Sequence, residues 1–187
     1  MASRMLTFVS SNDEKYREIH EVIAASGVTL VRAELDVPEI QSIDPAEVAG
    51  FKARKAFQIL GAGSVLVEDT GLALTAWNSY PGALIKWLLK AVGEEGVCRQ
   101  LDAWTDRSAV ATVALCLFDG AHLHRFTGHT EGTITASPRG TYGFGWDSVF
   151  QPSGSTLTYG EMAREDKMKI SMRAQAAAAL AAYLRGT

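Results

Sequence analysis

The hydrophobic positions of the chain follow two different spacings. Runs of consecutive or alternating apolar residues are typical of buried strands, whereas apolar residues that recur every three or four positions are typical of a helix with one packed face. Val65-Leu66-Val67 has the first spacing, and Tyr16, Ile19 and Val22 have the second. From these patterns we predict strands over residues 5–10, 28–33, 65–67, 109–118 and 122–134, and helices over residues 13–25, 45–60, 83–92, 95–104 and 170–185.

Turn-forming residues separate these predicted elements. Ser11 and Glu14 have the spacing of a capping box at the start of a helix. Asp119-Gly120 lies between two long apolar segments and predicts a hairpin turn. Residues 137–160, which are rich in glycine and proline, predict loops. Strands that alternate with helices, followed by a hairpin, indicate a single α/β domain over residues 1–187 with a mixed β-sheet.

The composition limits the classes of partner and the compartment. The chain has 18 lysine and arginine residues against 21 aspartate and glutamate residues, and this net charge of −3 argues against a protein that binds the phosphate backbone of nucleic acids. The two cysteines, Cys98 and Cys116, imply no disulfide framework. No apolar stretch approaches the length of a membrane span. We therefore expect a cytoplasmic protein with no nucleic-acid and no membrane partner.

Two adjacent carboxylates are the most informative polar feature. Glu68 and Asp69 directly follow the apolar run at 65–67, so the predicted strand ends on them. Unpaired carboxylates held close together repel and are costly to ionise, which indicates a cleft or a cation at this point. Mg²⁺ is typically bound through one or two carboxylates together with substrate phosphates. A loop that begins with two solvated acids is the alternative interpretation.

Other segments suit a phosphate group. Residues 10–15 form a predicted strand-to-helix turn, where free backbone N–H groups and Lys15 favour an anion, although an ordinary helix cap with a surface lysine fits as well. Lys52 and Lys86 lie in apolar helical surroundings, so each either meets an anion or extends its ammonium group to solvent. Glu39 follows Pro38 in an extended bend, which directs it into a cleft or leaves it solvated.

Two further segments suit an aromatic ligand. Residues 143–147 combine two glycines, Phe144, Trp146 and Asp147, which together suit an aromatic heterocycle; a glycine-rich turn with a buried aromatic pair is the alternative. Lys167, Ser171 and Arg173 gather near the start of the last predicted helix. Residues two apart face different ways on a continuous helix, so a shared site requires Lys167 to lie before that helix. A solvated basic helix start is the other interpretation.

In this order and spacing, the segments resemble the inosine triphosphate pyrophosphatase family. The resemblance covers nearly the whole chain, from Phe8 to Arg173, and its strongest stretches are residues 65–70, 81–87, 144–147 and 158–162. It implies an elongated, two-lobed α/β fold with a twisted mixed β-sheet flanked by helices, a cleft between the lobes, and a homodimer. It also implies Mg²⁺-dependent hydrolysis of noncanonical purine nucleotides, namely ITP, dITP and XTP, to the monophosphate and pyrophosphate.

The resemblance assigns roles to residues at matching positions. The residues expected to hold the triphosphate are Ser10, Asn12, Lys15, Lys52 and Lys86, and Thr70 is expected to bind the substrate. Glu39, Glu68 and Asp69 are expected to bind the metal ion, and Asp69 also activates the attacking water, with Glu68 and Lys15 beside it in the catalytic group. Phe144 is expected to stack on the purine. The base pocket is expected to be completed by Trp146, Asp147, Lys167 and Arg173, and Ser171 is expected to bind the substrate.

The chain departs from the family pattern at three places. Ser10-Ser11 stand where the family usually has Thr-Gly, Met168 replaces an asparagine, and Met172 replaces a histidine next to Arg173. Loss of the imidazole removes a polar group that can recognise the base, so Met172 bears on base selectivity.

Two other functions compete with the favoured one. The same chemistry on modified pyrimidine triphosphates is typical of the related Maf-like proteins. A nucleotide-binding protein without turnover is the third hypothesis, and it leaves the grouping of Glu39, Glu68 and Asp69 unexplained.

Overall fold

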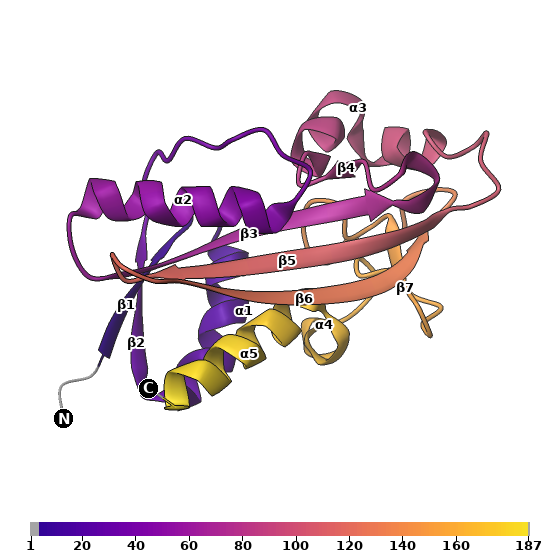
Figure 1. Cartoon of the computed structure of the whole chain (residues 1–187). Coiled ribbons are helices and arrows are strands. Elements are labelled where there is room, and N and C mark those ends of the chain that lie inside the picture. The colour runs from indigo at the N-terminus through magenta and orange to yellow at the C-terminus, as the bar shows by residue number, and fades with distance from the viewer. Residues whose placement is uncertain (1–3, 187) are drawn as a thin grey trace.

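A computed structural model describes residues 4–186 of the chain as an elongated α/β molecule (Figure 1). The strands are β1 (Arg4–Val9), β2 (Val28–Ala33), β3 (Ser64–Leu74), β4 (Pro81–Gly82), β5 (Ser108–Phe118), β6 (Leu123–Ile134) and β7 (Phe150–Pro152). The helices are α1 (Asp13–Ile23), α2 (Pro45–Leu60), α3 (Ile85–Arg99), α4 (Arg164–Ile170) and α5 (Met172–Gly186), with short 3₁₀ turns at Ala24–Ser26 and Thr75–Trp77.

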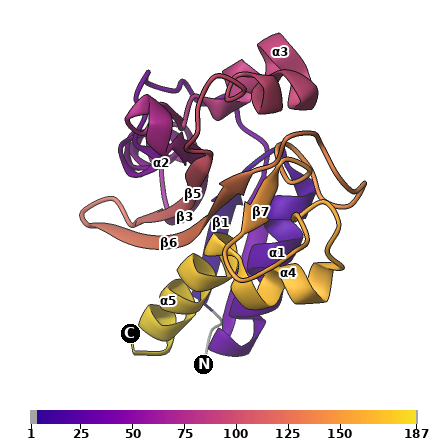
Figure 2. The same cartoon turned by 90° about the vertical axis from the view of Figure 1, so that its right-hand side faces the viewer.

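The strands form one mixed sheet in the order β2-β1-β3-β5-β6-β7, and β4 pairs with β3. β1 is parallel to β2 and β3, whereas the pairs β3–β5, β5–β6, β6–β7 and β3–β4 are antiparallel. The predicted α/β class with a mixed sheet is therefore confirmed. The sheet twists along its length, with α2 on one face and α1 and α5 on the other (Figure 2).

The strand register divides the molecule into two lobes. β1 pairs with the first residues of β3, up to Val67, and carries β2 beside it. β4 pairs with β3 at Leu72 and Ala73, and β7 pairs with the last residues of β6. The long strands β3, β5 and β6 run through both lobes, while α3 lies beside β4 at the second lobe (Figure 1).

Alternation along β3 sends its apolar side chains to two cores, because successive residues of a strand point to opposite faces. Leu66 packs on the side of α1 and α5, in one cluster with Ile19 and Leu180. Val65 and Val67 pack on the other side against alanines of α2, including Ala53. Since both faces of β3 are covered, its polar residues also meet different surroundings on the two sides.

The structure corrects several predicted boundaries. β3 does not end at Val67 but continues to Leu74, so Glu68 and Asp69 lie in the middle of a strand. The prediction of a strand end was wrong because the pairing with β5 runs unbroken from Val65 to Leu74. The three-residue strand β7 lies within the predicted loop at 137–160.

The boundaries of the last three predicted helices also differ from the structure. The non-helical backbone of Gly93 divides α3 into two helical parts, so the two helices predicted over 83–92 and 95–104 are confirmed, but they begin at Ile85 and end at Arg99. Ile170 belongs to a separate helix, α4, and α5 begins at Met172. Ser171 lies between them in an extended conformation, so the chain changes direction there.

A different residue caps the first helix. The side chain of Asn12 accepts a hydrogen bond from the backbone N–H of Lys15 at 3.1 Å, so Asn12 takes the position predicted for Ser11. Across residues 4–186, none of the helices is long and apolar enough to cross a membrane.

Candidate functional site

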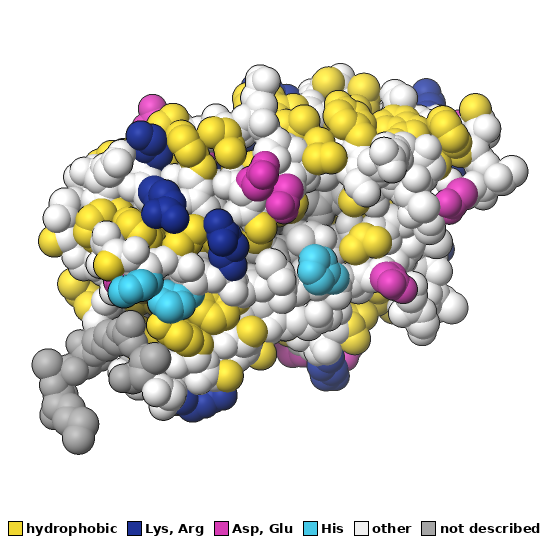
Figure 3. Space-filling view, in the orientation of Figure 1, with side chains coloured by type: hydrophobic (Ala, Val, Ile, Leu, Met, Phe, Trp, Pro, Cys, Tyr) yellow, Lys and Arg dark blue, Asp and Glu magenta, His cyan; other side chains and the backbone are white. Residues whose placement is uncertain are grey.

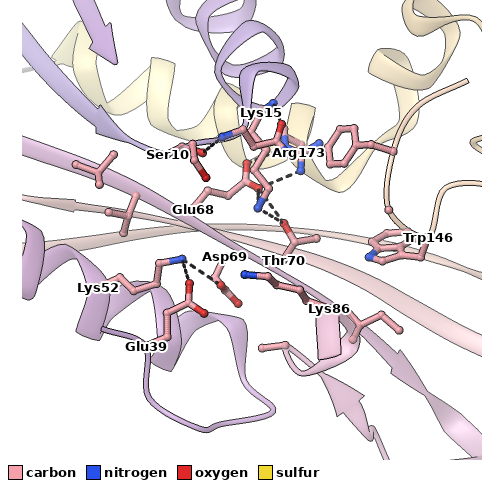
Figure 4. A pocket seen from close by; sticks show the side chains of 18 of the residues that line it. Ser10, Lys15, Glu39, Lys52, Glu68, Asp69, Thr70, Lys86, Trp146 and Arg173 are labelled. Carbon is pink, nitrogen blue, oxygen red and sulfur yellow. Dashed lines mark hydrogen bonds and ion pairs between the residues drawn. The ribbon is translucent and has the colours of Figure 1, made fainter. Parts of the chain in front are cut away.

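A cleft lies where β3 is paired on one side only. β1 leaves β3 after Val67 and β4 joins it at Leu72, so in the described part of the chain residues 68–71 have no partner strand on that edge. The cleft has a volume of about 520 Å³, within the range of small-molecule sites. Its lining includes Ser10, Asn12, Lys15, Glu39, Lys52, Glu68, Asp69, Thr70, Lys86, Phe144, Trp146, Asp147, Met172 and Arg173 (Figure 4).

Glu68 and Asp69 point to opposite faces of β3, as neighbours on a strand must. Glu68 points toward Lys15 and Arg173, whereas Asp69 points toward Lys52 (Figure 4). The two carboxylates therefore do not share one cation. Within residues 4–186, no group of three or more His, Cys, Asp or Glu side chains is placed to hold a metal ion. The expected metal site of Glu39, Glu68 and Asp69 therefore stays a prediction, and in this structure Glu68 faces away from Asp69.

Glu68 is fully engaged with protein groups. Arg173 donates from Nε to Oε2 at 2.7 Å and from Nη2 to Oε1 at 3.0 Å, and Lys15 Nζ lies 3.0 Å from Oε1. The Thr70 hydroxyl also donates to Oε1 at 2.8 Å. Burial opposes ionisation, but the charges of Arg173 and Lys15 outweigh it and hold the pKa of Glu68 far below its usual range. Glu68 therefore positions cationic side chains.

Arg173 has a second buried carboxylate partner that sequence reasoning missed. Its Nη1 donates to Oε2 of Glu18 on α1 at 2.5 Å, and Glu18 also lies 3.8 Å from Lys167. Glu18 is 3% exposed. Its position three residues after Lys15, on the face of α1 that also carries Ile19, is the signal that identifies it. This cluster joins α1, β3 and α5.

Asp69 has a different environment. Its Oδ1 lies 3.5 Å from Nζ of Lys52, which also lies 2.8 Å from Oε1 of Glu39. Its Oδ2 is buried and has no hydrogen-bond partner among residues 4–186. Burial outweighs the attraction of Lys52 and Lys15, so the pKa of Asp69 is raised to about 6. An orphaned carboxylate oxygen of this kind suits a cation or a bound water.

Another part of the cleft wall carries the aromatic residues Phe144 and Trp146. Asp147 accepts from the backbone N–H of Phe144 at 2.8 Å and from Nζ of Lys167 at 2.7 Å. A side chain on Gly143, whose φ is +76°, would meet the Asp147 carboxylate, so only glycine fits this turn. Trp146 is 7% exposed and packs edge-on against Phe150. The segment therefore presents Phe144 on a rigid support.

Three lysines also line the cleft. Lys15 lies in the first turn of α1, Lys52 comes from α2, and Lys86 comes from the start of α3. The side-chain hydroxyl of Ser10 accepts from the backbone N–H of Asn12 at 3.1 Å, which shapes the turn before α1. Three lysines and the positive end of α1 face one cleft, which suits a ligand that carries several negative charges.

The arrangement agrees with a known family. The model of the Ham1 family matches residues 6–183. The chain belongs to the Ham1 family. An inosine triphosphate pyrophosphatase of Kluyveromyces lactis is 44% identical over 188 residues, which cover 97% of this chain and 96% of that protein. A dITP/XTP pyrophosphatase of Methanopyrus kandleri is 37% identical over 171 residues, 90% of each chain.

The fold of a Ham1 family protein is also shared. The structure of a HAM1 protein from Coxiella burnetii superposes with a TM-score of 0.87 and 28% sequence identity, and the match covers 98% of this chain and 100% of that one. The elongated fold expected from the sequence is thereby confirmed.

Two of the expected site residues lie behind the wall of the cleft. Ser171 is fully buried, and its hydroxyl accepts from the backbone N–H of Ala174 at the start of α5. Lys167 is 3% exposed, and its Nζ lies 5.1 Å from the centroid of the Phe144 ring. Neither is among the residues that line the described cleft. Their contact with a ligand stays a prediction, and in this structure they support Phe144 and Arg173.

Proposed function

We propose that this protein hydrolyses ITP, dITP and XTP to the nucleoside monophosphate and pyrophosphate, with Mg²⁺ as the cofactor. The observation that carries the proposal is that one cleft is lined by the carboxylate of Asp69, by Lys15, Lys52 and Lys86, and by the aromatic side chains of Phe144 and Trp146. The activities named for the Kluyveromyces and Methanopyrus relatives support the same substrates.

The carboxylates fit a divalent cation. Asp69 offers a buried oxygen without a hydrogen-bond partner among the described residues, and Glu39 lies across Lys52 from it. Glu39 and Asp69 would hold Mg²⁺, with phosphate oxygens and waters as the other ligands. The bound ion would neutralise charge that develops on the phosphate under attack. Glu68 takes no part as a ligand in this proposal, because Arg173, Lys15 and Thr70 occupy its oxygens.

The other roles are activation of the water, binding of the triphosphate and recognition of the base. Asp69 orients the attacking water and accepts its proton, for which a raised pKa near the operating pH is favourable. Lys15, Lys52 and Lys86 bind the triphosphate and offset its charge, with Ser10, Asn12 and Thr70 beside them. Phe144 stacks on the base, while Trp146 and Asp147 shape its pocket.

A panel of nucleoside triphosphates with Mg²⁺ tests the proposal. If the metal ion and the lysines act on the phosphate next to the nucleoside, ITP should yield monophosphate and pyrophosphate. The products are scored separately for pyrophosphate and orthophosphate. Orthophosphate with accumulating diphosphate would place the attack at the terminal phosphate. Turnover confined to modified pyrimidine nucleotides favours the Maf-like alternative, and tight binding with no turnover favours a binding protein.

Base selectivity gives a second prediction. Arg173 uses Nε, Nη1 and Nη2 on Glu18 and Glu68, and a guanidinium has further N–H groups to offer to a 6-keto oxygen. Met172, which is 2% exposed and lines the cleft, offers only a weak acceptor. We expect ITP to be preferred over ATP, and Met172→His to change the ratio of their kcat/KM values about 5-fold or more, the effect of one buried hydrogen bond.

The control for this prediction is Met168→His, a matched exchange at a half-buried position outside the cleft lining. It should leave the ratio of kcat/KM for ITP and ATP unchanged. Equal kcat/KM values of the parent for ITP and ATP contradict the prediction, as does an equal effect of both histidine variants.

We also propose a cytoplasmic homodimer. The buried free thiols of Cys98 and Cys116 suit a reducing compartment. Large apolar side chains are exposed around α3, among them Tyr80 at 44% and Trp87 at 56%. Figure 3 shows apolar side chains gathered along this upper edge of the molecule, which suits a contact with a second copy. A monomeric mass in light scattering at micromolar concentration contradicts the dimer.

A further inference from the structure

Lys52 occupies the space between the two carboxylates assigned to the metal ion. Its Nζ lies 2.8 Å from Oε1 of Glu39 and 3.5 Å from Oδ1 of Asp69 (Figure 4). The three side chains come from different elements, since Lys52 is on α2, Glu39 precedes that helix and Asp69 is on β3. The side chain of Lys52 is 17% exposed, so the ammonium group is held within the wall of the cleft.

An ammonium group and a divalent ion exclude each other from this space. Both require oxygens of Glu39 and Asp69, and at such short separation two cations repel strongly in a partly desolvated site. An ion that enters the nucleotide-free cleft must therefore displace Lys52. The displaced ammonium would lose its carboxylate partners within a partly buried wall, which is unfavourable. Lys52 thus lowers the metal affinity of the free protein.

Lys52 neutralises Asp69 incompletely. It carries a single charge and reaches Oδ1, while Oδ2 remains buried with no hydrogen-bond partner in the described chain. A divalent ion would compensate this carboxylate better than the ammonium does, so the lysine is replaceable.

A triphosphate offers Lys52 another anion in the same cleft, which Lys15 and Lys86 also line. We propose that Lys52 is an exchangeable counter-ion, which holds Glu39 and Asp69 in the free protein and moves to the triphosphate when metal and nucleotide bind together. This inference rests on the proposed function. It implies positive coupling, because each ligand strengthens binding of the other by the same factor.

This inference is tested by titrating the nucleotide-free protein with Mn²⁺. The electron paramagnetic resonance signal of the free ion measures how much Mn²⁺ is bound. Lys52→Met keeps the length of the side chain and removes its charge. We expect this variant to bind Mn²⁺ at least about 10-fold more tightly than the parent, because a competing cation is absent. The control is Lys55→Met on the same helix, since Lys55 donates to Gln58 at 3.1 Å and lies outside the cleft lining. It should bind Mn²⁺ as the parent does.

A second variant locates the bound ion. In the double variant Lys52→Met with Asp69→Asn, we expect the gain in Mn²⁺ affinity to disappear. Lys52→Gln replaces Lys52→Met if circular dichroism shows that the methionine variant is unfolded. The titration involves no turnover, so it is independent of the nucleotide panel that tests the proposed function. The inference is overturned if the Lys52 variant binds Mn²⁺ no more tightly than the parent does. It is also overturned if the gain in Mn²⁺ affinity persists in the double variant with Asp69→Asn.

Discussion

Asp69→Asn is expected to remove nearly all turnover and at the same time to make the fold more stable. The amide has almost the shape of the carboxylate, but it lacks the charge that we propose binds the metal ion and accepts the proton of the water. We expect kcat to fall by at least about 10³-fold, which combines the loss of a general base with the loss of a metal ligand. Steady-state kinetics with ITP and Mg²⁺ measure the change. A variant that retains most of the parent kcat removes Asp69 from the mechanism.

The gain in stability follows from the raised pKa of Asp69. Its pKa is about 6 in the folded protein against a model-compound value of 3.8, so the folded state binds the proton more tightly than the unfolded state does. The contribution of this group to stability is therefore greatest below about pH 4 and is lost as the pH rises through about 6. Above that pH, we expect Asp69→Asn to raise the free energy of unfolding by up to about 3 kcal/mol.

Urea unfolding between pH 4 and pH 8 measures this difference. The parent and Asp69→Asn should be about equally stable near pH 4 and should separate as the pH rises. Asp119→Asn is a contrasting control, because Asp119 accepts backbone N–H groups of Ala121 and His122, and these hydrogen bonds lower its pKa to about 2. That variant should lose stability at neutral pH. If Asp69→Asn is less stable than the parent at pH 7, burial of the Asp69 carboxylate does not destabilise the fold, and the prediction is contradicted.

Arg173→Met is expected to destabilise the fold strongly. Arg173 is 2% exposed and neutralises two buried carboxylates, Glu68 and Glu18. Removing one partner from a buried ion cluster leaves uncompensated charge, which typically costs about 3–5 kcal/mol. Urea unfolding measures the loss. Arg185→Met on the same helix is the matched control, because Arg185 is exposed and its loss should change stability by less than about 0.5 kcal/mol.

A second substitution separates charge from packing. In the Arg173→Met background, Glu68→Gln removes one of the stranded charges, so we expect the double variant to recover part of the lost stability. A loss caused by packing alone would show no such recovery. If Arg173→Met is no less stable than Arg185→Met, the buried cluster does not stabilise the fold.

Glu68 and Asp69 show how partners decide the chemistry of equivalent groups. Glu68 is buried and Asp69 is partly buried on the same strand, yet burial is outweighed by Arg173 and Lys15 at Glu68 and is not outweighed by Lys52 at Asp69. The pKa is lowered at the first residue and raised at the second. One carboxylate thus remains a fixed charge that positions cations, while its neighbour has a pKa suited to proton transfer.

Most of the local structure could be predicted from the sequence. The strand Val28–Ala33 and the helix Pro45–Leu60 were predicted to the residue, because apolar spacing, a proline at the helix start and a closing glycine act within a few positions. The β5–β6 hairpin followed from its turn for the same reason. The order of the motifs along the chain indicated the family, and this resemblance identified most of the residues that line the cleft.

The surroundings of those residues could not be predicted, because they depend on how distant segments pack. Glu68 and Asp69 are adjacent in sequence, but pairing with β5 extends β3 through them and sends their side chains to opposite sides. Glu18 acquires its role from Arg173, which lies 155 residues away in the chain. Lys52 lies between Glu39 and Asp69 because a helix, a loop and a strand meet there. Such contacts depend on sheet register and packing between distant segments, which local patterns do not encode.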